Sequence, residues 1–562
     1  MTAANKIPPA PRWNLDSIFE GGSKSEAFRK HREKVKAALA ETKATLAKLP
    51  ASIDEETAEA WVQLILRMQT VAEDISLINN FVEALQAQDV SDAQADAVAV
   101  EGFLYKSQWD DLRTELEALA VKQSDSQWQL LLSDARLKGI EFYLNELREQ
   151  ARSKMPVELE SLALELSVNG FHAWNQLYDK MGGELRADFE QDGKVNRLSM
   201  GQLATKMSDP DRAVRCEAFE KLTQSWEPRA DLAAMILNSL AGFRLSLYNR
   251  RKWDSVLKEP LMMSRLKDES LEAMWAVVGR ETKRLAPYIE AKKKLLGIDK
   301  FSWYDQFAPC GTVDKLYSYN EAIDFICDNF KPFSPEIVDF IRMAVEKRWI
   351  EAEDRPGKQG GAFCTRMGAF RETRVFMTYA GSYDNLLTLA HELGHSYHGW
   401  VLRDTPFFST IYPMSLAESA SNFFEAMVND AALESTTDPR VKVMLLEQKL
   451  QAAYTMFTDL HCRYLFDRAF YAERQHGVVG KDRLNELMVE AQKKAFGSLL
   501  DESGHHPLFW CTKLHFFLSQ LPLYNFPYTF GYLFAGGVYD RAKKEGTAFA
   551  EQYKNLLADS GS

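Results

Sequence analysis

The sequence predicts a mainly α fold. From Ser25 to Tyr178 almost every stretch has apolar residues at three- and four-residue steps, with Ala, Leu, Glu and Lys dominant. The helical pattern resumes at Ser199 and continues past Lys347, and it fills most of residues 441–499. Strand-like alternation is confined to two short hairpin signals. With 562 residues, 46% of them apolar and 26% charged, the chain can bury a large core.

The charge balance argues against a nucleic-acid partner. The chain has 68 basic and 80 acidic residues, a net charge of −12, and no basic stripe. No run of about 18 apolar residues is present, so we expect no membrane-spanning helix. The first residues lack the apolar core of a secretory signal, and the six cysteines show no CxxC spacing. These features favour a cytoplasmic protein with reduced thiols. The oligomeric state cannot be predicted from them.

A composition break near residue 185 predicts a domain boundary. Residues 185–198 alternate around Asp192-Gly193, which is a hairpin signal. We therefore expect an N-terminal helical domain at residues 1–184 and a domain that carries the chemistry at residues 185–562. The apolar and polar faces of the helices in the first domain are those expected for packing and for contact with solvent, so we assign no chemistry to this domain.

A second break in the helical pattern falls at a glycine-rich loop, residues 354–361. Two strand-like runs follow, residues 362–367 and 374–379, so we expect a β-hairpin just before the next helix. An extended peptide could pair with the backbone of such a strand, which makes Gly361 and Ala362 candidate substrate contacts. The alternative is that the hairpin only supports the helix that follows it.

The most specific chemical signal is the HExxH motif His391-Glu-Leu-Gly-His395, which lies in a helical pattern. Helical residues four apart lie one turn apart on the same face, so His391 and His395 can each give a nitrogen to one Zn²⁺ at about 2.0–2.1 Å. Glu392 lies one step round the helix, where it can hydrogen-bond a metal-bound water without binding the metal. A chance HExxH is expected in roughly one sequence in a hundred of this length. The motif therefore predicts a metal site, and its ligand types favour zinc.

Two histidines leave the site incomplete, because a catalytic zinc usually has three protein ligands and a water. His398 lies another turn along the helix, where it could not easily reach the same ion, and Asp404 lies in a loop. Glu418 lies in the first turn of the next predicted helix, on a segment that can fold back. Glu425, two turns further along the same face, could orient a ligating histidine. From the residues alone, Glu418 could equally be a helix cap.

The motif at 391–395, followed by Ala417-Glu-Ser-Ala-Ser421 and Glu425, resembles the oligoendopeptidase F family, relatives of thimet oligopeptidase. The opening at residues 13–19, Trp-Asn-Leu-Asp-Ser-Ile-Phe, and the chain length agree with that family. The resemblance implies that Glu418 is the third zinc ligand and that Glu425 supports the ligands. It also implies a largely helical two-part ellipsoid with the zinc deep in a groove, which would restrict substrates to short peptides.

The resemblance further implies a histidine and tyrosines on a C-terminal segment that faces the zinc. His515 and the run at residues 524–532 are similar to that segment, which implies catalytic roles for His515 and Tyr532 and substrate-binding roles for Tyr528 and Tyr524. The three tyrosines recur every four residues, so on a helix they would share a face. Phenolic hydroxyls suit an oxyanion because they donate a hydrogen bond without adding net charge. The same spacing is also typical of an aromatic core stripe.

Together these observations predict a zinc-dependent endopeptidase with one Zn²⁺ per chain, in which Glu392 activates a zinc-bound water and short peptides are cut at internal bonds. One alternative is a zinc exopeptidase, a carboxy- or aminopeptidase, built on the same helix motif. No clamp for a terminal carboxylate or amine is evident in the sequence. A second alternative is a non-catalytic peptide-binding relative. The intact motif argues against it, because a structural zinc does not need Glu392.

Overall fold

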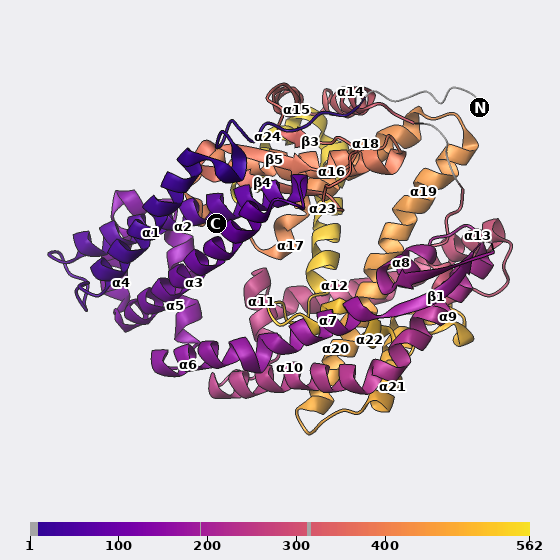
Figure 1. Cartoon of the computed structure of the whole chain (residues 1–562), viewed down its shortest axis with the longest axis horizontal. Coiled ribbons are helices and arrows are strands. Elements are labelled where there is room, and N and C mark those ends of the chain that lie inside the picture. The colour runs from indigo at the N-terminus through magenta and orange to yellow at the C-terminus, as the bar shows by residue number, and fades with distance from the viewer. Residues whose placement is uncertain (1–8, 192, 312–315, 562) are drawn as a thin grey trace. The chain divides into compact units, whose positions relative to one another are not determined.

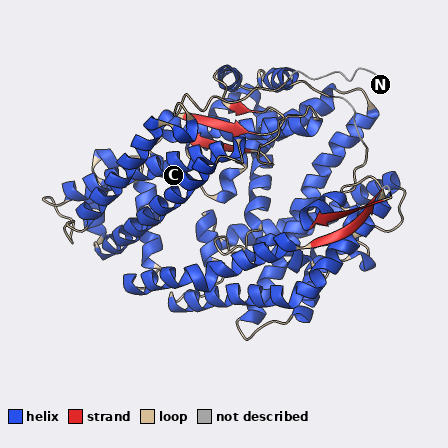
Figure 2. Cartoon of the chain, viewed as in Figure 1, coloured by secondary structure: helices blue, strands red, loops and turns tan. Residues whose placement is uncertain are grey.

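The computed structural model of the chain describes residues 9–191, 193–311 and 316–561 (Figure 1). Helices predominate, and the strands of the described residues form two small sheets, which confirms the mainly α fold (Figure 2). The chain folds into two compact units that alternate along the sequence. Unit 1 comprises residues 1–157, 314–431 and 533–562, and unit 2 comprises residues 158–313 and 432–532. None of the unit bounds falls at residue 185, where the sequence predicts a domain boundary. The two domains expected from the sequence, residues 1–184 and 185–562, stay a prediction.

Unit 1 contains a bundle in which α1, α2 and α3 pack against one another. Helix α2 is buried on several sides, with Trp61, Ile65, Phe81 and Leu85 all at most 2% exposed, because it contacts both neighbours. The helices that lie mainly or in large part in unit 1 are α1 (Glu26–Leu46), α2 (Ala58–Gln88), α3 (Ala93–Lys122), α4 (Asp125–Leu132), α5 (Glu141–Arg152), α14 (Tyr319–Phe330), α15 (Pro335–Glu346), α16 (Tyr383–Val401), α17 (Met414–Ala417), α18 (Ser419–Ser435), α23 (Phe526–Glu545) and α24 (Ala550–Ala558).

A three-stranded sheet in unit 1 precedes the helix that carries the HExxH motif. Its strand order is β3 (Ile350–Glu351), β5 (Glu372–Phe376) and β4 (Phe363–Met367). Strands β4 and β5 are antiparallel, with Phe363 opposite Phe376, which confirms the predicted hairpin. Helix α16 follows β5 along the chain and packs on both β4 and β5. The sheet therefore supports the motif helix from one side. Strand β3 was not predicted, since two residues are too few to show an alternating pattern.

Unit 2 contains the other hairpin and a second set of helices. Strands β1 (Arg186–Gln191) and β2 (Lys194–Ser199) are antiparallel, with Arg186 opposite Ser199, which confirms the hairpin predicted there. Gly193 in the turn has a φ of +71°, a conformation that glycine adopts without strain. Asp192, the other predicted turn residue, lies outside the described residues. The helices with residues in unit 2 are α6 (Val157–Ser167), α7 (Ala173–Glu184), α8 (Met200–Lys206), α9 (Arg212–Trp226), α10 (Ala230–Arg250), α11 (Lys258–Ser264), α12 (Asp268–Glu281), α13 (Ala286–Leu296), α19 (Pro439–Tyr454), α20 (Leu460–Arg474), α21 (Lys481–Phe496), α22 (Phe509–Thr512) and parts of α18 and α23.

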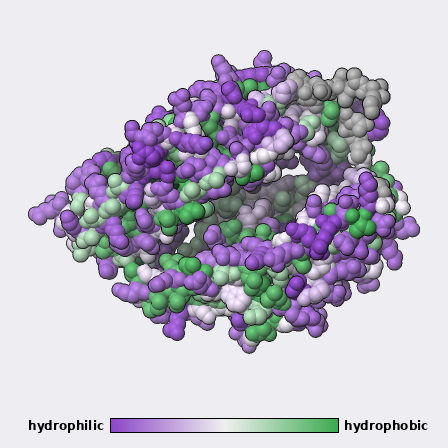
Figure 3. Space-filling view, in the orientation of Figure 1, coloured by the Kyte–Doolittle hydropathy of each residue, from purple (hydrophilic) through white to green (hydrophobic). Residues whose placement is uncertain are grey.

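One helical stretch of the described residues, Arg212–Arg250, is long and apolar enough to cross a membrane by length and composition alone. Half of the residues in its most apolar part are buried inside the protein, as in the core helices of soluble proteins. The stretch joins α9 and α10, and α10 buries Ile236, Leu237 and Leu240 within unit 2. Packing therefore accounts for its apolar character. On the face of the molecule shown in Figure 3, hydrophilic side chains predominate.

Candidate metal centre

Helix α16 carries both histidines of the motif. Its first turn is capped by Ser382, whose side chain accepts a hydrogen bond from the Asn385 backbone N–H. The helix buries Leu386, Leu389, Ala390 and Leu393 on its inner face, which fixes its rotation. His391 and His395 lie one turn apart with their ring centroids separated by 5.0 Å. Their side chains are 26% and 20% exposed, so both rings are partly accessible.

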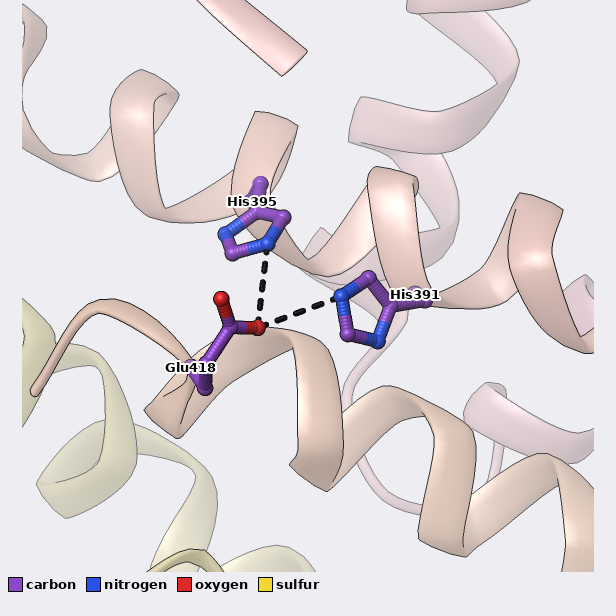
Figure 4. Close-up of side chains that lie close together, drawn as sticks. All are labelled: His391, His395 and Glu418. Atoms are coloured by element: carbon purple, nitrogen blue, oxygen red, sulfur yellow. Dashed lines mark ion pairs between the residues drawn. The ribbon is translucent and has the colours of Figure 1, made fainter. Parts of the chain in front are cut away.

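Glu418 lies against both imidazoles. Its Oε2 is 3.2 Å from His391 Nε2 and 3.3 Å from His395 Nε2 (Figure 4). Atoms bound to one tetrahedral ion at about 2.0–2.1 Å lie about 3.3–3.4 Å from each other, so this spacing fits a single zinc-sized ion. Two imidazole nitrogens and one carboxylate oxygen are also a donor set that zinc accepts. Among the residues that the structure describes, His391, His395 and Glu418 are the group placed to share a metal ion.

Glu418 lies at a break between two helices rather than in the first turn of one. The sequence predicted Glu418 in the first turn of one helix, whereas α17 ends at Ala417 and α18 begins at Ser419. The Glu418 side chain accepts a hydrogen bond from Ser421 Oγ at 2.7 Å, with the same Oε2 that faces the histidines. Ser421 is completely buried. It was part of the motif that carried the family resemblance, but its contact with Glu418 was not predicted.

Gly394, inside the motif, permits the close approach of α18 to α16. A Cβ atom at this position would lie 2.6 Å from the Ala420 carbonyl oxygen and 2.7 Å from Ser421 Cα. Because both neighbours are backbone atoms, any larger residue would push the start of α18 away. The glycine thus brings Glu418 within reach of the two histidines. A glycine inside a strongly helical pattern was the available sequence signal for this contact.

Glu425 contacts the other nitrogen of His391. Its Oε2 lies 3.2 Å from His391 Nδ1, so the imidazole N–H donates to the carboxylate while Nε2 faces Glu418. Metal-binding histidines commonly donate their second N–H to a carboxylate in this way, which fixes the tautomer and the ring orientation. The contact that the sequence suggested for Glu425 is therefore present in the structure.

The charged groups of the site shift one another's pKa. Burial opposes the charge on His391, but hydrogen bonds with Glu418 and Glu425 outweigh it and raise the pKa to about 10. Burial alone would raise the pKa of Glu418, yet His391 and His395 hold it well below its usual range. Burial raises the pKa of Glu392, although both histidines oppose the shift. Glu392 Oε2 is buried without a hydrogen-bond partner, so it can accept a proton from a bound molecule.

The two other candidates for the third ligand have different partners. His398 is fully buried, its Nε2 lies 2.8 Å from Ser560 Oγ, and its ring stacks on Tyr412 at 4.4 Å. Asp404 is 59% exposed and pairs with Arg371 at 3.1 Å. Glu418 is the candidate that the structure brings to the histidines.

Gly361 and Ala362, the predicted substrate contacts in unit 1, lie immediately before the edge strand β4. Gly361 has a φ of +95°, which suits glycine. Further along β4, the Arg366 carbonyl accepts a hydrogen bond from Asn80 of α2 at 2.7 Å, so α2 covers that end of the strand. The pairing of a peptide with this strand stays a prediction.

His515, Tyr524 and Tyr528 form an aromatic cluster in unit 2. His515 stacks on Tyr524 with centroids 5.8 Å apart, and Tyr524 and Tyr528 are 4.8 Å apart. Helix α23 begins at Phe526, so Tyr528 and Tyr532 lie one turn apart in it, while Tyr524 precedes it. The shared helical face predicted for three tyrosines thus holds for two. The roles of these residues stay predictions.

The imidazole of His515 is held in its neutral form. Burial lowers its pKa to about 4, and the nearby cations of Arg463 and Lys513 add to the shift, while Asp459 opposes it. Its Nδ1 is buried without a hydrogen-bond partner. Near neutral pH this ring can therefore donate or accept a hydrogen bond without carrying charge.

The chain matches two models of peptidase families. The model of peptidase family M3 matches residues 205–562, and the model of oligopeptidase F matches residues 121–186. The chain is 24% identical to the chromosomal oligoendopeptidase F of Lactococcus lactis subsp. cremoris, over 98% of this chain and 91% of the relative. It is 22% identical to the oligopeptidase PepF of Bacillus subtilis, over 99% of this chain and 83% of the relative.

Solved structures show the same fold. A putative peptidase from Chlamydophila abortus superimposes with a TM-score of 0.83 at 18% identity, over 99% of this chain and 93% of that one. Oligoendopeptidase-F from Enterococcus faecium gives a TM-score of 0.71 at 18% identity, over 96% of this chain and 92% of that one. The fold therefore extends over nearly the whole chain.

Proposed function

Because the chain belongs to peptidase family M3, and is thus a peptide hydrolase, we propose that it is a zinc-dependent endopeptidase that cuts internal bonds of short oligopeptides. One observation carries the proposal. His391, His395 and Glu418 converge at 3.2–3.3 Å beside Glu392, a buried carboxylate with an unpartnered oxygen. The names of the relatives, oligoendopeptidase F and oligopeptidase PepF, support the substrate class.

One Zn²⁺ per chain would be held by His391 Nε2, His395 Nε2 and a Glu418 oxygen. When bound, the ion polarises the scissile carbonyl and lowers the pKa of a water toward about 7. Glu425 keeps His391 in the tautomer that presents Nε2, and Ser421 orients the Glu418 carboxylate. These two contacts reduce the reorganisation needed on metal binding.

Glu392 is the proposed general base and then the general acid. Its free Oε2 accepts the proton of the attacking water and afterwards delivers it to the leaving amine. Burial favours the protonated form of this carboxyl, which makes it a stronger base for the first step. Both transfers use one oxygen that has no competing hydrogen bond.

The residues of the C-terminal segment are proposed to stabilise the oxyanion and to bind the peptide. Tyr532 and neutral His515 would donate hydrogen bonds to the tetrahedral oxyanion, and one such donor contributes about 3–4 kcal/mol. Tyr528 and Tyr524 would contact the substrate. Because each donor is neutral, it stabilises negative charge without attracting a second anion.

Gly361 and Ala362 are proposed to contact the backbone of the bound peptide, laid along the start of β4 as an added strand.

The protein is further proposed to have a groove that admits only short peptides, and to be cytoplasmic. A series of quenched peptides of increasing length tests the groove: longer peptides should be cleaved progressively more slowly, and a folded protein should not be cleaved.

The test of the proposed function is Glu392→Gln, which keeps the shape of the side chain and removes the base. We expect the purified variant to retain its metal and to lose hydrolysis of an internally quenched peptide by at least about a thousandfold. Asp404→Asn, at an exposed carboxylate outside the site, is the matched control and should be fully active. Near-normal turnover by Glu392→Gln would reject the assigned base.

Mass spectrometry of the products of a nonapeptide separates the alternatives. Internal fragments support the endopeptidase, whereas stepwise loss of single residues supports the exopeptidase. A zinc-loaded protein that binds the peptide and leaves it intact supports the non-catalytic alternative.

A further inference from the structure

A buried arginine holds the beginning of the loop at residues 518–525, which connects His515 to α23. Arg244, on α10, is 4% exposed. Its guanidinium donates to the carbonyl oxygens of Leu518 at 2.5 Å and Ser519 at 3.0 Å, and to the Tyr471 hydroxyl at 3.2 Å. Two consecutive loop carbonyls are thus bound by one side chain from a distant helix.

A buried aspartate holds the end of the same loop. Asp467, on α20, accepts a hydrogen bond from Asn525 Nδ2 at 2.7 Å, and both side chains lie in the interior of unit 2. Asn525 Oδ1 in turn accepts from the backbone N–H of Phe526, the first residue of α23. Asp467 therefore fixes the point at which this helix begins, two residues before Tyr528.

Between these two anchors the loop has a strained backbone. Leu523 has a φ of +48°, a left-handed conformation that is strained for a residue with a Cβ atom. The residue is buried and directly precedes Tyr524. Arg244, Asp467, Leu523 and His515 line one small cavity, so the anchors and the strained residue face the same space as the histidine of the aromatic cluster. Such strain persists only where the surroundings impose it.

We propose that Arg244 and Asp467 are positioning residues that hold loop 518–525 in its strained form and thereby set His515, Tyr524 and Tyr528 for the substrate. Neither side chain needs to touch the peptide: each acts through loop atoms to which it is hydrogen-bonded. This inference rests on the proposed function, because it assumes that the aromatic cluster contacts the oxyanion and the substrate.

A purely architectural role predicts a different result, and the chain offers a matched control. Arg215 is a second buried arginine of unit 2 that binds backbone carbonyls, those of Tyr304, Asp209 and Pro210, and also pairs with Asp305. It has no hydrogen bond with loop 518–525. Loss of a buried arginine should therefore destabilise unit 2 in both cases, whereas only Arg244 should affect catalysis.

The experiment compares Arg244→Lys with Arg215→Lys in the full-length zinc-loaded enzyme. Thermal unfolding identifies the temperature at which both variants are folded. At that temperature we expect Arg244→Lys to lower kcat by about tenfold to a hundredfold with KM changed less than threefold, since a displacement of about 1 Å suffices for such a loss. Arg215→Lys should keep kcat within twofold. Equal losses in the two variants would overturn the proposal.

A double-mutant cycle tests whether the effect passes through the aromatic cluster. In the His515→Ala/Tyr528→Phe background, the further loss caused by Arg244→Lys should shrink to less than threefold. An undiminished loss in that background would overturn the inference and leave the proposed function intact. Wild-type activity of His515→Ala/Tyr528→Phe would instead overturn the roles assigned to the cluster, and this inference with them.

Asp467 provides an independent variant. Asp467→Asn keeps an oxygen that can accept from Asn525, so we expect kcat within threefold of the wild type. Asp467→Ala removes the acceptor, and we expect a loss of about tenfold or more in kcat with KM little changed. Failure of the asparagine variant to restore the activity lost in the alanine variant would contradict the positioning role of this hydrogen bond.

Discussion

The candidate metal centre of unit 1 and the aromatic cluster of unit 2 are built in opposite ways. The two histidines occupy consecutive turns of a regular helix, so their spacing follows from helical geometry alone. His515 lies in a single short turn of 3-10 helix and Tyr524 in irregular backbone, and side chains from α10 and α20 hold the loop between them. A site on a regular element depends on few residues outside it. A site on a strained loop depends on distant anchors, and this difference governs how each region should respond to mutation.

The largest effect should come from the residue that joins two segments at the metal centre. Glu418→Ala removes one of the three proposed metal ligands, and we expect peptide hydrolysis to fall by at least about a thousandfold, with zinc lost on dialysis. Activity assays with parallel metal analysis by mass spectrometry measure both quantities. If Glu418→Ala kept one zinc per chain and its activity, Glu418 would not be a ligand.

Gly394→Ala tests whether close backbone packing places Glu418. The added methyl group would meet the backbone of Ala420 and Ser421, so we expect zinc affinity to fall by about a hundredfold. A chelator competition titration measures the affinity. Gly183→Ala, at a helical glycine of α7 with open space around it, is the control and should leave zinc affinity unchanged. Equal affinities in the two variants would refute the packing argument.

Glu425→Ala removes the hydrogen bond to His391 and keeps all three proposed ligands. The ring should lose its fixed orientation, and we expect zinc affinity to fall about tenfold to a hundredfold. The same chelator titration applies, with Glu336→Ala, which breaks the ion pair with Lys554, as the control. An unchanged affinity would mean that the helix alone orients His391.

An effect on stability rather than on activity should come from a buried histidine of unit 2. His506 is 2% exposed, and burial lowers its pKa to about 3, below the value of about 6.5 in an unfolded chain. The unfolded state therefore binds more protons below pH 6.5, and stability falls by up to about 1.4 kcal/mol per pH unit between pH 6.5 and 3. Denaturant unfolding of His506→Phe should show a flatter pH dependence over this range. A slope equal to that of the wild type would contradict the buried neutral histidine.

The parts of the site that follow a local pattern were predictable. The spacing of His391 and His395, the hairpin before them and the mainly α class all follow from periods of 3.6 and 2 residues. The assignment of Glu418 needed a family resemblance, because nothing local shows that a carboxylate 23 residues after His395 folds back. The structure supplies the missing reason at Gly394, where two backbones nearly touch.

Contacts made by long-range packing were not predictable from one sequence. In the sequence, nothing distinguishes Ser421 from other polar helix residues. In the structure its hydroxyl donates a hydrogen bond to Glu418. The sequence predicts only that Arg244 lies on a helix. Its hydrogen bond to the Leu518 carbonyl joins two residues far apart in the chain, and no local sequence pattern predicts such a contact. The positive φ of Leu523 is similarly unforeseeable, since leucine rarely adopts it.

His391, His395 and Glu418 are proposed to bind one zinc ion together. A crystal structure of the zinc-loaded protein, with anomalous data collected at the zinc absorption edge, tests it most directly. We predict one strong peak per chain at about 2.0–2.1 Å from both Nε2 atoms and from a Glu418 oxygen. A peak bound by other residues, or one that leaves Glu418 out of contact, would contradict the account.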